Sequence, residues 1–154
     1  MVASRLVSYM YRFEKVLTIR EQEKNETEIA YKEAVRSFEE VATKLYDLLK
    51  KKENLIEFQQ ERLVVGSSIE EIHHYARFID SLEKTIADVQ QKVVQARSKM
   101  NWYEEKLLEK NLEVRKFEKM REKDYKSFQQ EQDRIESIFL DEISSLTYFK
   151  KEIR

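Results

Sequence analysis

The sequence predicts an all-α protein, with two long helices in an antiparallel coiled-coil hairpin and a second helix that is longer and leaves a C-terminal overhang. The 154 residues contain no proline and one glycine, Gly66, so there is one strong helix breaker. Apolar side chains recur every seven residues on both sides of Gly66. Charged residues make up 38% and hydrophobic residues 41%, as in helices that bury one stripe and expose the rest. We expect residues 1–154 to form a single hairpin.

The first helix is expected from about residue 5 to about residue 64. Its apolar row opens near the N-terminus, becomes polar at Arg20, Lys24 and Thr27, and then resumes. The members of this row are Leu6, Met10, Phe13, Leu17, Tyr31, Ala34, Phe38, Val41, Leu45, Leu48 and Leu55. The polar interruption fits either a flexible point or a contact with a partner, and the pattern does not choose between them.

The turn is expected at residues 65–68. Gly66 can adopt the left-handed conformation that ends a helix without a side-chain penalty. Ser67 or Ser68 then caps the next helix, and an acidic residue follows each serine at the capping-box spacing.

The second helix is expected from about residue 69 to about residue 150, and its apolar row is the more regular of the two. Seven residues repeat at heptad spacing: Ile72, Ile79, Ile86, Val93, Met100, Leu107 and Val114. Seven more lie between them: Tyr75, Leu82, Val89, Ala96, Tyr103, Lys110 and Phe117. Only Lys110 is polar, so the row predicts a packed seam along this helix.

Pairing across Gly66 places position 13 near position 120. The N-terminal end of the first arm should therefore lie beside residue 130 or so of the second helix. About twenty residues of the second helix then remain unpaired, roughly 30 Å at 1.5 Å per residue. Apolar side chains continue there at three- and four-residue steps: Ile135, Ile138, Phe139, Ile143, Leu146, Phe149 and Ile153. This segment is either a frayed or folded-back end, or a helix that inserts into another protein's groove or ring.

Composition and motifs argue against several classes of function. The chain has no cysteine, which excludes disulfides and thiolate metal sites and is consistent with the cytoplasm. Arg5 and Arg12 interrupt the N-terminal apolar residues, so neither a secretion signal nor a transmembrane helix fits. The 29 basic and 30 acidic residues are interleaved, which disfavours nucleic acid and acidic lipid as partners. We therefore expect a soluble protein.

Catalysis and cofactor binding are also not expected. Two helices side by side form a seam rather than a water-excluding pocket. Phosphate-binding loops need several closely spaced glycines, and only Gly66 is present. His73 and His74 are adjacent in sequence and point about 100° apart on a helix, so they do not predict a metal site.

Two aromatic residues fall outside the seam row of the second helix. Phe78 and Trp102 either pack on the edge of the seam or anchor an interface, and both interpretations remain open. Residues 104–126 alternate in charge, which is typical of a solvated helix surface and also allows docking onto an oligomeric partner.

The chain resembles the flagellar export protein FliJ family, a coiled-coil component of the flagellar type III export apparatus. The resemblance covers nearly the whole chain and lies in four segments. They are YRFEKVLTIRE (Tyr11 to Glu21), HYARFIDSLEKTI (His74 to Ile86), EKNLEVRKFEKMREKDYKSF (Glu109 to Phe128) and LDEIS (Leu140 to Ser144). Their order and spacing about one Gly-Ser turn carry the resemblance.

The resemblance implies a non-catalytic stalk that couples parts of the export machine in flagellum biogenesis, motility and chemotaxis. The implied partners are a FliI-type export ATPase ring, whose assembly and activity the stalk promotes, and the cytoplasmic domain of an FlhA-type export gate protein. A FliH-type regulator and export chaperones are further implied partners. The protein would lie in the cytoplasm, peripheral to the cell membrane, with no transmembrane segment. The alternatives are an injectisome stalk and a homodimeric coiled-coil spacer.

The resemblance also implies two contact surfaces. Phe78 and Leu82 would face the export gate. The ATPase-facing residues would be Tyr11, Arg12, Phe13, Phe117, Met120, Arg121 and Tyr125 from the paired ends, with Ile135, Phe139, Ile143, Leu146 and Phe149 from the overhang.

Overall fold

The computed structural model describes residues 8–153, and within this range it contains two α-helices and no strand. Helix α2 spans Glu14–Val65 and helix α3 spans Ile69–Ile153, with 52 and 85 residues. The two helices pack against each other, so the predicted all-α class with a longer second helix is confirmed. The contacts divide into two compact units. We call Asn25–Leu108 the turn unit, and the described part of Met1–Lys24 with Glu109–Arg154 the terminal unit.

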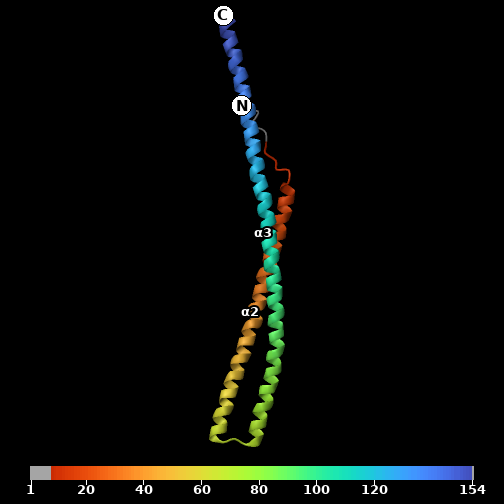
Figure 1. Ribbon diagram of the computed structural model, residues 1–154, viewed down its shortest axis with the longest axis vertical. Coiled ribbons are helices and arrows are strands. Elements are labelled where there is room, and N and C mark those ends of the chain that lie inside the picture. The colour runs from red at the N-terminus through yellow and green to blue at the C-terminus, as the bar shows by residue number, and fades with distance from the viewer. Residues whose placement is uncertain (1–7, 154) are drawn as a thin grey trace. The chain divides into compact units, whose positions relative to one another are not determined.

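The turn unit is an antiparallel pair of helical segments joined at Gly66 (Figure 1). Its most buried side chains are Ala34, Leu82, Ile86 and Val89. The last three follow one another at four- and three-residue steps, which is the predicted seam of α3. Because these apolar side chains leave water together, their burial stabilises the helix pair.

Contacts between the two arms of the turn unit set the direction of pairing. The rings of Phe58 and Tyr75 meet edge to face with centroids 5.7 Å apart. Farther from the turn, the Lys52 ammonium lies 3.2 Å from the Glu83 carboxylate. Residue numbers fall on one arm as they rise on the other, so the arms are antiparallel.

The turn between the helices comprises Gly66, Ser67 and Ser68. Gly66 has a φ of 108°, a conformation that residues with a side chain rarely adopt, and its N–H donates to the Arg62 carbonyl at 2.9 Å. The Glu71 N–H donates to the Ser68 hydroxyl at 3.2 Å, which makes Ser68 the N-cap of α3. The Ser67 hydroxyl donates to the Glu71 carboxylate at 2.8 Å, so both serines act at the turn.

The terminal unit has a small core of Tyr11, Leu17 and Val114, with Tyr9, Phe13 and Phe117 packed against it. Leu17 is 1% exposed and is the most buried side chain of this core. It comes from the first turn of α2, whereas Val114 comes from α3. The unit therefore ties the start of α2 to the middle of α3.

The prediction that the first helix starts near residue 5 is wrong for residues 8–13, which precede α2 and are not helical. Residues 5–7 lie outside the described part of the chain. Side chains alternate here: Tyr9, Tyr11 and Phe13 face inward, whereas Met10 is 86% exposed. A period of two is typical of extended chain. The prediction that Met10 belongs to the seam row is therefore wrong.

The Tyr9 ring contacts Phe128, and helix α3 continues beyond Phe128 to Ile153. We call residues 129–153 the C-terminal overhang. From residue 137 to residue 152 every side chain is exposed within the described structure. In residues 8–153, no helix is long and apolar enough to span a membrane.

Candidate functional site

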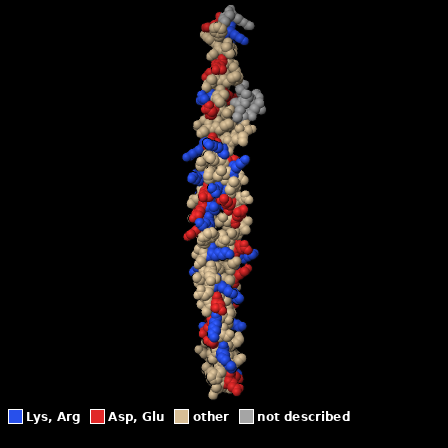
Figure 2. All heavy atoms as spheres, turned by 90° about the vertical axis from the view of Figure 1, so that its right-hand side faces the viewer, with Lys and Arg blue, Asp and Glu red and all other residues tan. Residues whose placement is uncertain are grey.

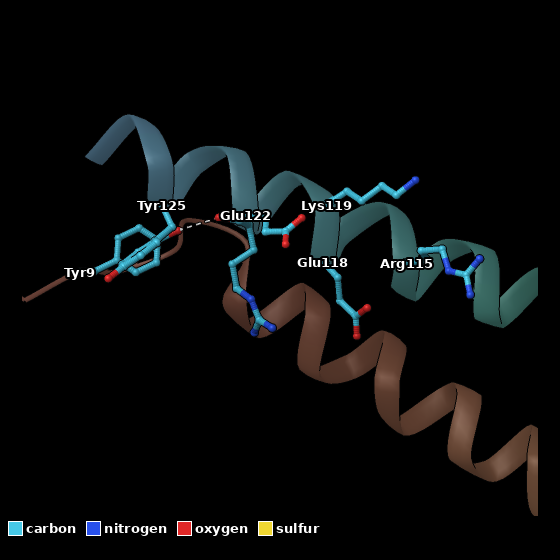
Figure 3. Close-up of a pocket in the computed structure, with 7 residues that line it drawn as sticks. Tyr9, Arg115, Glu118, Lys119, Glu122 and Tyr125 are labelled. Carbon is cyan, nitrogen blue, oxygen red and sulfur yellow. Dashed lines mark hydrogen bonds between the residues drawn. The ribbon is translucent and has the colours of Figure 1, made fainter. Parts of the chain in front are cut away.

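Residues 8–13 form an aromatic strap that lies on α3 in the terminal unit (Figure 3). The Tyr9 ring meets Tyr125 edge to face with centroids 5.0 Å apart and lies 5.3 Å from Phe128. Its hydroxyl donates to the Asp124 carboxylate at 2.8 Å. One side chain of the strap thus makes apolar and polar contacts with α3.

The other inward residues of the strap contact α3 about two to three turns earlier. The Tyr11 hydroxyl donates to the Phe117 carbonyl at 3.2 Å, and Tyr11 is 8% exposed. The Phe13 ring lies 6.4 Å from the Phe117 ring, while the Arg12 guanidinium lies 5.5 Å from the Phe13 centroid. These contacts bury the strap's aromatic side and leave Arg12 on the outside.

The environment of Tyr9 keeps its phenol protonated. Burial, followed by the hydrogen bond to the Asp124 carboxylate and the charge of that group, raises the pKa of Tyr9 to about 12. Both effects disfavour the phenolate, because it loses hydration and is repelled by a neighbouring anion. The Tyr9 hydroxyl therefore remains a hydrogen-bond donor to a higher pH than an ordinary tyrosine does.

An open groove on α3 borders the strap (Figure 3). Its lining residues are Tyr9, Arg115, Glu118, Lys119, Arg121, Glu122 and Tyr125. Arg121 pairs with Glu14 at 3.4 Å and so links α3 to the first residue of α2. The groove carries charges of both signs, in keeping with the interleaved charges on the face in Figure 2. Such a surface favours docking of a protein over binding of a polyanion.

A layer of polar side chains lies where the apolar rows of both helices are interrupted. Lys110 of α3 lies 3.2 Å from the Glu23 carboxylate of α2, which Arg20 also contacts at 3.1 Å. Arg20 reaches toward Glu113 at 3.8 Å. The hydrogen bonds from Lys110 and then Arg20 lower the pKa of Glu23. Arg20, one of the polar residues that interrupt the row of the first helix, thus contacts carboxylates of the same chain.

The overhang presents a C-terminal stripe, defined as Ile135, Ile138, Phe139, Ile143, Leu146 and Phe149. Their exposed fractions range from 43% to 63%. At 100° per residue they lie within an arc of about 140°, which is one face of the helix. Large apolar side chains gathered on one exposed face mark an interaction surface.

The two predicted gate-facing residues differ in exposure. Phe78 is 41% exposed, and the Lys51 ammonium lies 5.5 Å from its ring centroid. Leu82 is 7% exposed within the seam of the turn unit, so it cannot contact a partner while the helices are paired. We correct its assignment to packing, since it occupies a heptad position that faces α2. Trp102, the second aromatic residue off the row, is exposed with Lys106 5.4 Å from its ring.

The predicted ATPase-facing residues also differ in exposure. Arg12, Met120 and Tyr125 are exposed and open to a partner. Phe13, Phe117 and Arg121 are half-buried, and Tyr11 is buried, because the strap and α3 cover one another. The overhang residues in the same prediction are all exposed.

Sequence reasoning missed Tyr9, Asp124 and Phe128, which hold the end of the strap. The available signal was the alternation in Tyr9-Met10-Tyr11-Arg12-Phe13, which a heptad count passes over. No sequence pattern pointed to Asp124, since its role depends on the Tyr9 hydroxyl that lies opposite it in the structure.

The fold and these surfaces define a two-helix coiled-coil protein with a large apolar helix face uncovered in the described structure. Such a face is suited to binding other proteins.

Comparison with known proteins identifies the family. The family model described as "Flagellar FliJ protein" matches residues 9–152. The chain is 42% identical over 138 residues to the "Flagellar FliJ protein" of Bacillus subtilis (strain 168), covering 90% of this chain and 94% of that relative. No solved structure matches. The chain belongs to the flagellar FliJ family and is a flagellar export-associated protein.

Proposed function

We propose that this protein is the non-catalytic stalk of the flagellar type III export apparatus. Its terminal unit would promote assembly and activity of the export ATPase ring, and its turn unit would contact the export gate and export chaperones. The observation that carries the proposal is the exposed C-terminal stripe in a chain of the flagellar FliJ family.

The stripe supports a protein partner for energetic reasons. Each of its six side chains is about half exposed, so covering the rest contributes on the order of 1 kcal/mol per side chain. A helix also brings little backbone flexibility to the contact, which limits the entropy lost on binding. A helical end with one apolar face suits insertion into a groove or ring.

The turn unit supports a second contact through Phe78. This ring is exposed on α3, and Lys51 of α2 adds a positive charge beside it. An exposed aromatic ring with an adjacent cation can anchor an interface. Leu82 supports this surface from within the seam rather than by direct contact.

Coupling would operate by differential binding. A stalk that binds one nucleotide state of the ATPase ring more tightly than another shifts the ring toward the preferred state. If the gate also binds better in one state, the two events share a coupling free energy. The protein would act on the cytoplasmic side of the membrane, held peripherally by the export apparatus.

The first test is ATP hydrolysis by the purified flagellar export ATPase, titrated with the full-length chain and with a chain ending at residue 130. We expect stimulation by the full chain and its loss on truncation. Leu146→Asp should reduce stimulation, because it places a charge on the stripe. Ser144→Asp is the matched control, since Ser144 is exposed on the opposite face of the same helix. Equal activity of all forms would contradict the proposal, as would ATP turnover by this chain alone.

The second test is binding to the cytoplasmic domain of the export gate protein, with Phe78→Ala against Trp102→Ala. Both are exposed aromatic residues with a lysine near the ring, so the pair controls for loss of aromatic surface. We expect weaker binding for Phe78→Ala alone, with helicity unchanged. Undiminished affinity would remove Phe78 from the proposed surface.

A further inference from the structure

The aromatic strap is attached to α3 by side chains. The backbone hydrogen bonds at its end are local, from the Glu14 N–H to the Tyr11 carbonyl and from the Leu17 N–H to the Phe13 carbonyl. Within the described residues, no hydrogen bond joins the strap's backbone to that of α3. The strap can therefore leave without breaking the helical hydrogen bonds of α3, and its opening is opposed by the side-chain contacts of Tyr9, Tyr11 and Phe13.

The face that the strap covers is the same face of α3 that carries the C-terminal stripe. Eighteen residues make five full turns of an α-helix, so residues 18 apart lie directly above one another. This spacing relates three residues beneath the strap, of which Phe117 and Phe128 are half-buried and Tyr125 is exposed, to three exposed residues of the stripe: Phe117 to Ile135, Tyr125 to Ile143, and Phe128 to Leu146. Phe128, which the Tyr9 ring contacts, lies about two turns of helix before Ile135, the first residue of the exposed stripe.

The cover is incomplete at its outer end. Tyr125 remains 43% exposed beneath Tyr9, and Tyr9 and Phe128 are both half-buried. By contrast, Tyr11 is buried deeper in the unit. Of the strap's three aromatic residues, Tyr9 contacts α3 nearest to the stripe, so a partner that advances from the stripe would reach it before Tyr11 and Phe13.

We infer that the aromatic strap is a detachable cover that competes with the export ATPase for the α3 face between Phe117 and Phe128. This inference rests on the proposed function and assigns a means of regulation to the same site. Displacement of the strap extends the docking stripe by about three turns of helix. Tyr11 and Phe13 then act by covering α3, which accounts for their burial better than direct contact with the ATPase does.

Competition has a measurable consequence for affinity. If the open form is a minor fraction of the free protein, the apparent dissociation constant is raised by the reciprocal of that fraction. Removing the outer attachment should therefore tighten ATPase binding. Tyr9→Ala deletes both ring contacts and the hydrogen bond to Asp124, while Met10→Ala is the matched control, because Met10 is the adjacent strap residue and is 86% exposed.

Strap opening can be observed in the full chain without a partner. The chain has no cysteine, so spin labels can be placed on Met10→Cys and Ser144→Cys, both exposed positions of the terminal unit. Electron–electron double resonance then reports the distance between the strap and the overhang. We expect a narrow distribution for the otherwise unchanged chain and a broader one after Tyr9→Ala or on addition of the ATPase.

Binding of the purified export ATPase is measured in parallel. We expect Tyr9→Ala to bind more tightly, on the order of tenfold, and Met10→Ala to bind as the unchanged chain does. A broadened distribution with unchanged or weaker binding would overturn the inference while leaving the proposed function intact. A distribution that stays narrow in Tyr9→Ala, in Tyr9→Ala with Phe13→Ala, and with the ATPase present would also overturn it. If Leu146→Asp binds as well as the unchanged chain, the proposed function itself fails.

Discussion

Helix α3 carries similar apolar rows in two places, and they have opposite exposures. In the turn unit Ile86 is 5% exposed, whereas Ile143 in the overhang is 43% exposed. Both are isoleucines of the same helix. The first faces α2, and the second faces no helix of the described structure. An apolar stripe thus specifies that a face needs a partner, but not whether the partner lies in the same chain.

The largest expected effect comes from placing a charge on each of these two isoleucines. Ile86→Asp should destabilise the protein by roughly 3 to 5 kcal/mol, because a carboxylate in a packed seam is left unpaired or forces the helices apart. Ile143→Asp should change stability by less than about 0.5 kcal/mol, since its side chain already contacts water. Thermal unfolding followed by circular dichroism measures both. Equal losses would show that the overhang is also packed, and the contrast between the two regions would fail.

A smaller effect is expected at the turn that brings α2 back onto α3. Gly66→Ala should cost about 1 to 2 kcal/mol, because the φ of 108° is unfavourable for any residue with a Cβ, although nothing lies within 4 Å of the added atom. Val65→Ala is the control, being 82% exposed at the end of α2. Urea unfolding of both variants tests whether backbone strain at one residue weakens the pairing. An unchanged midpoint for Gly66→Ala would contradict the role of the left-handed conformation.

The polar layer should make the terminal unit sensitive to acid. The pKa of Glu23 is lowered below its ordinary value of 4.5 by Lys110 first and then by Arg20. A lowered pKa adds stability above 4.5, and this stability is lost as the pH falls through the pKa of the folded state. Lys110→Met should raise the pKa of Glu23 and reduce this acid dependence.

Carboxylate titration by NMR, with Lys99→Met as an exposed control, measures this shift. If Lys110→Met leaves the pKa of Glu23 where it was, the contact across the helices is not the cause.

The smallest effect is expected at alkaline pH in the strap. The pKa of Tyr9 is raised to about 12 from 10.0, so the neutral phenol is favoured in the folded state. The stability it contributes is fully present below about pH 10 and is lost as the pH rises through the folded-state value near 12. Ultraviolet titration should show one late-ionising tyrosine that disappears in Tyr9→Phe. A Tyr9 that ionises with the exposed tyrosines would contradict the docked strap.

Local patterns predicted most of the helical architecture. One glycine in a chain without proline located the turn, and the heptad row from Ile72 onward located the seam of α3. Gly66 ends α2 and Ser68 caps α3 within the four residues expected, because turns and caps depend on neighbouring residues. The C-terminal stripe could also be predicted from the sequence, since helical periodicity places its members on one face.

The sequence by itself determined the two helices, the turn and the stripe, because helix periodicity, the freedom of glycine and serine capping act over a few residues. Only the tertiary structure decided which residues meet across the chain. It placed Glu23 against Lys110, buried Leu82, and docked Tyr9 on Tyr125, Phe128 and Asp124 instead of extending α2. These outcomes depend on what lies opposite each side chain, and aromatic burial outweighed helix formation where Tyr9, Tyr11 and Phe13 could all reach α3.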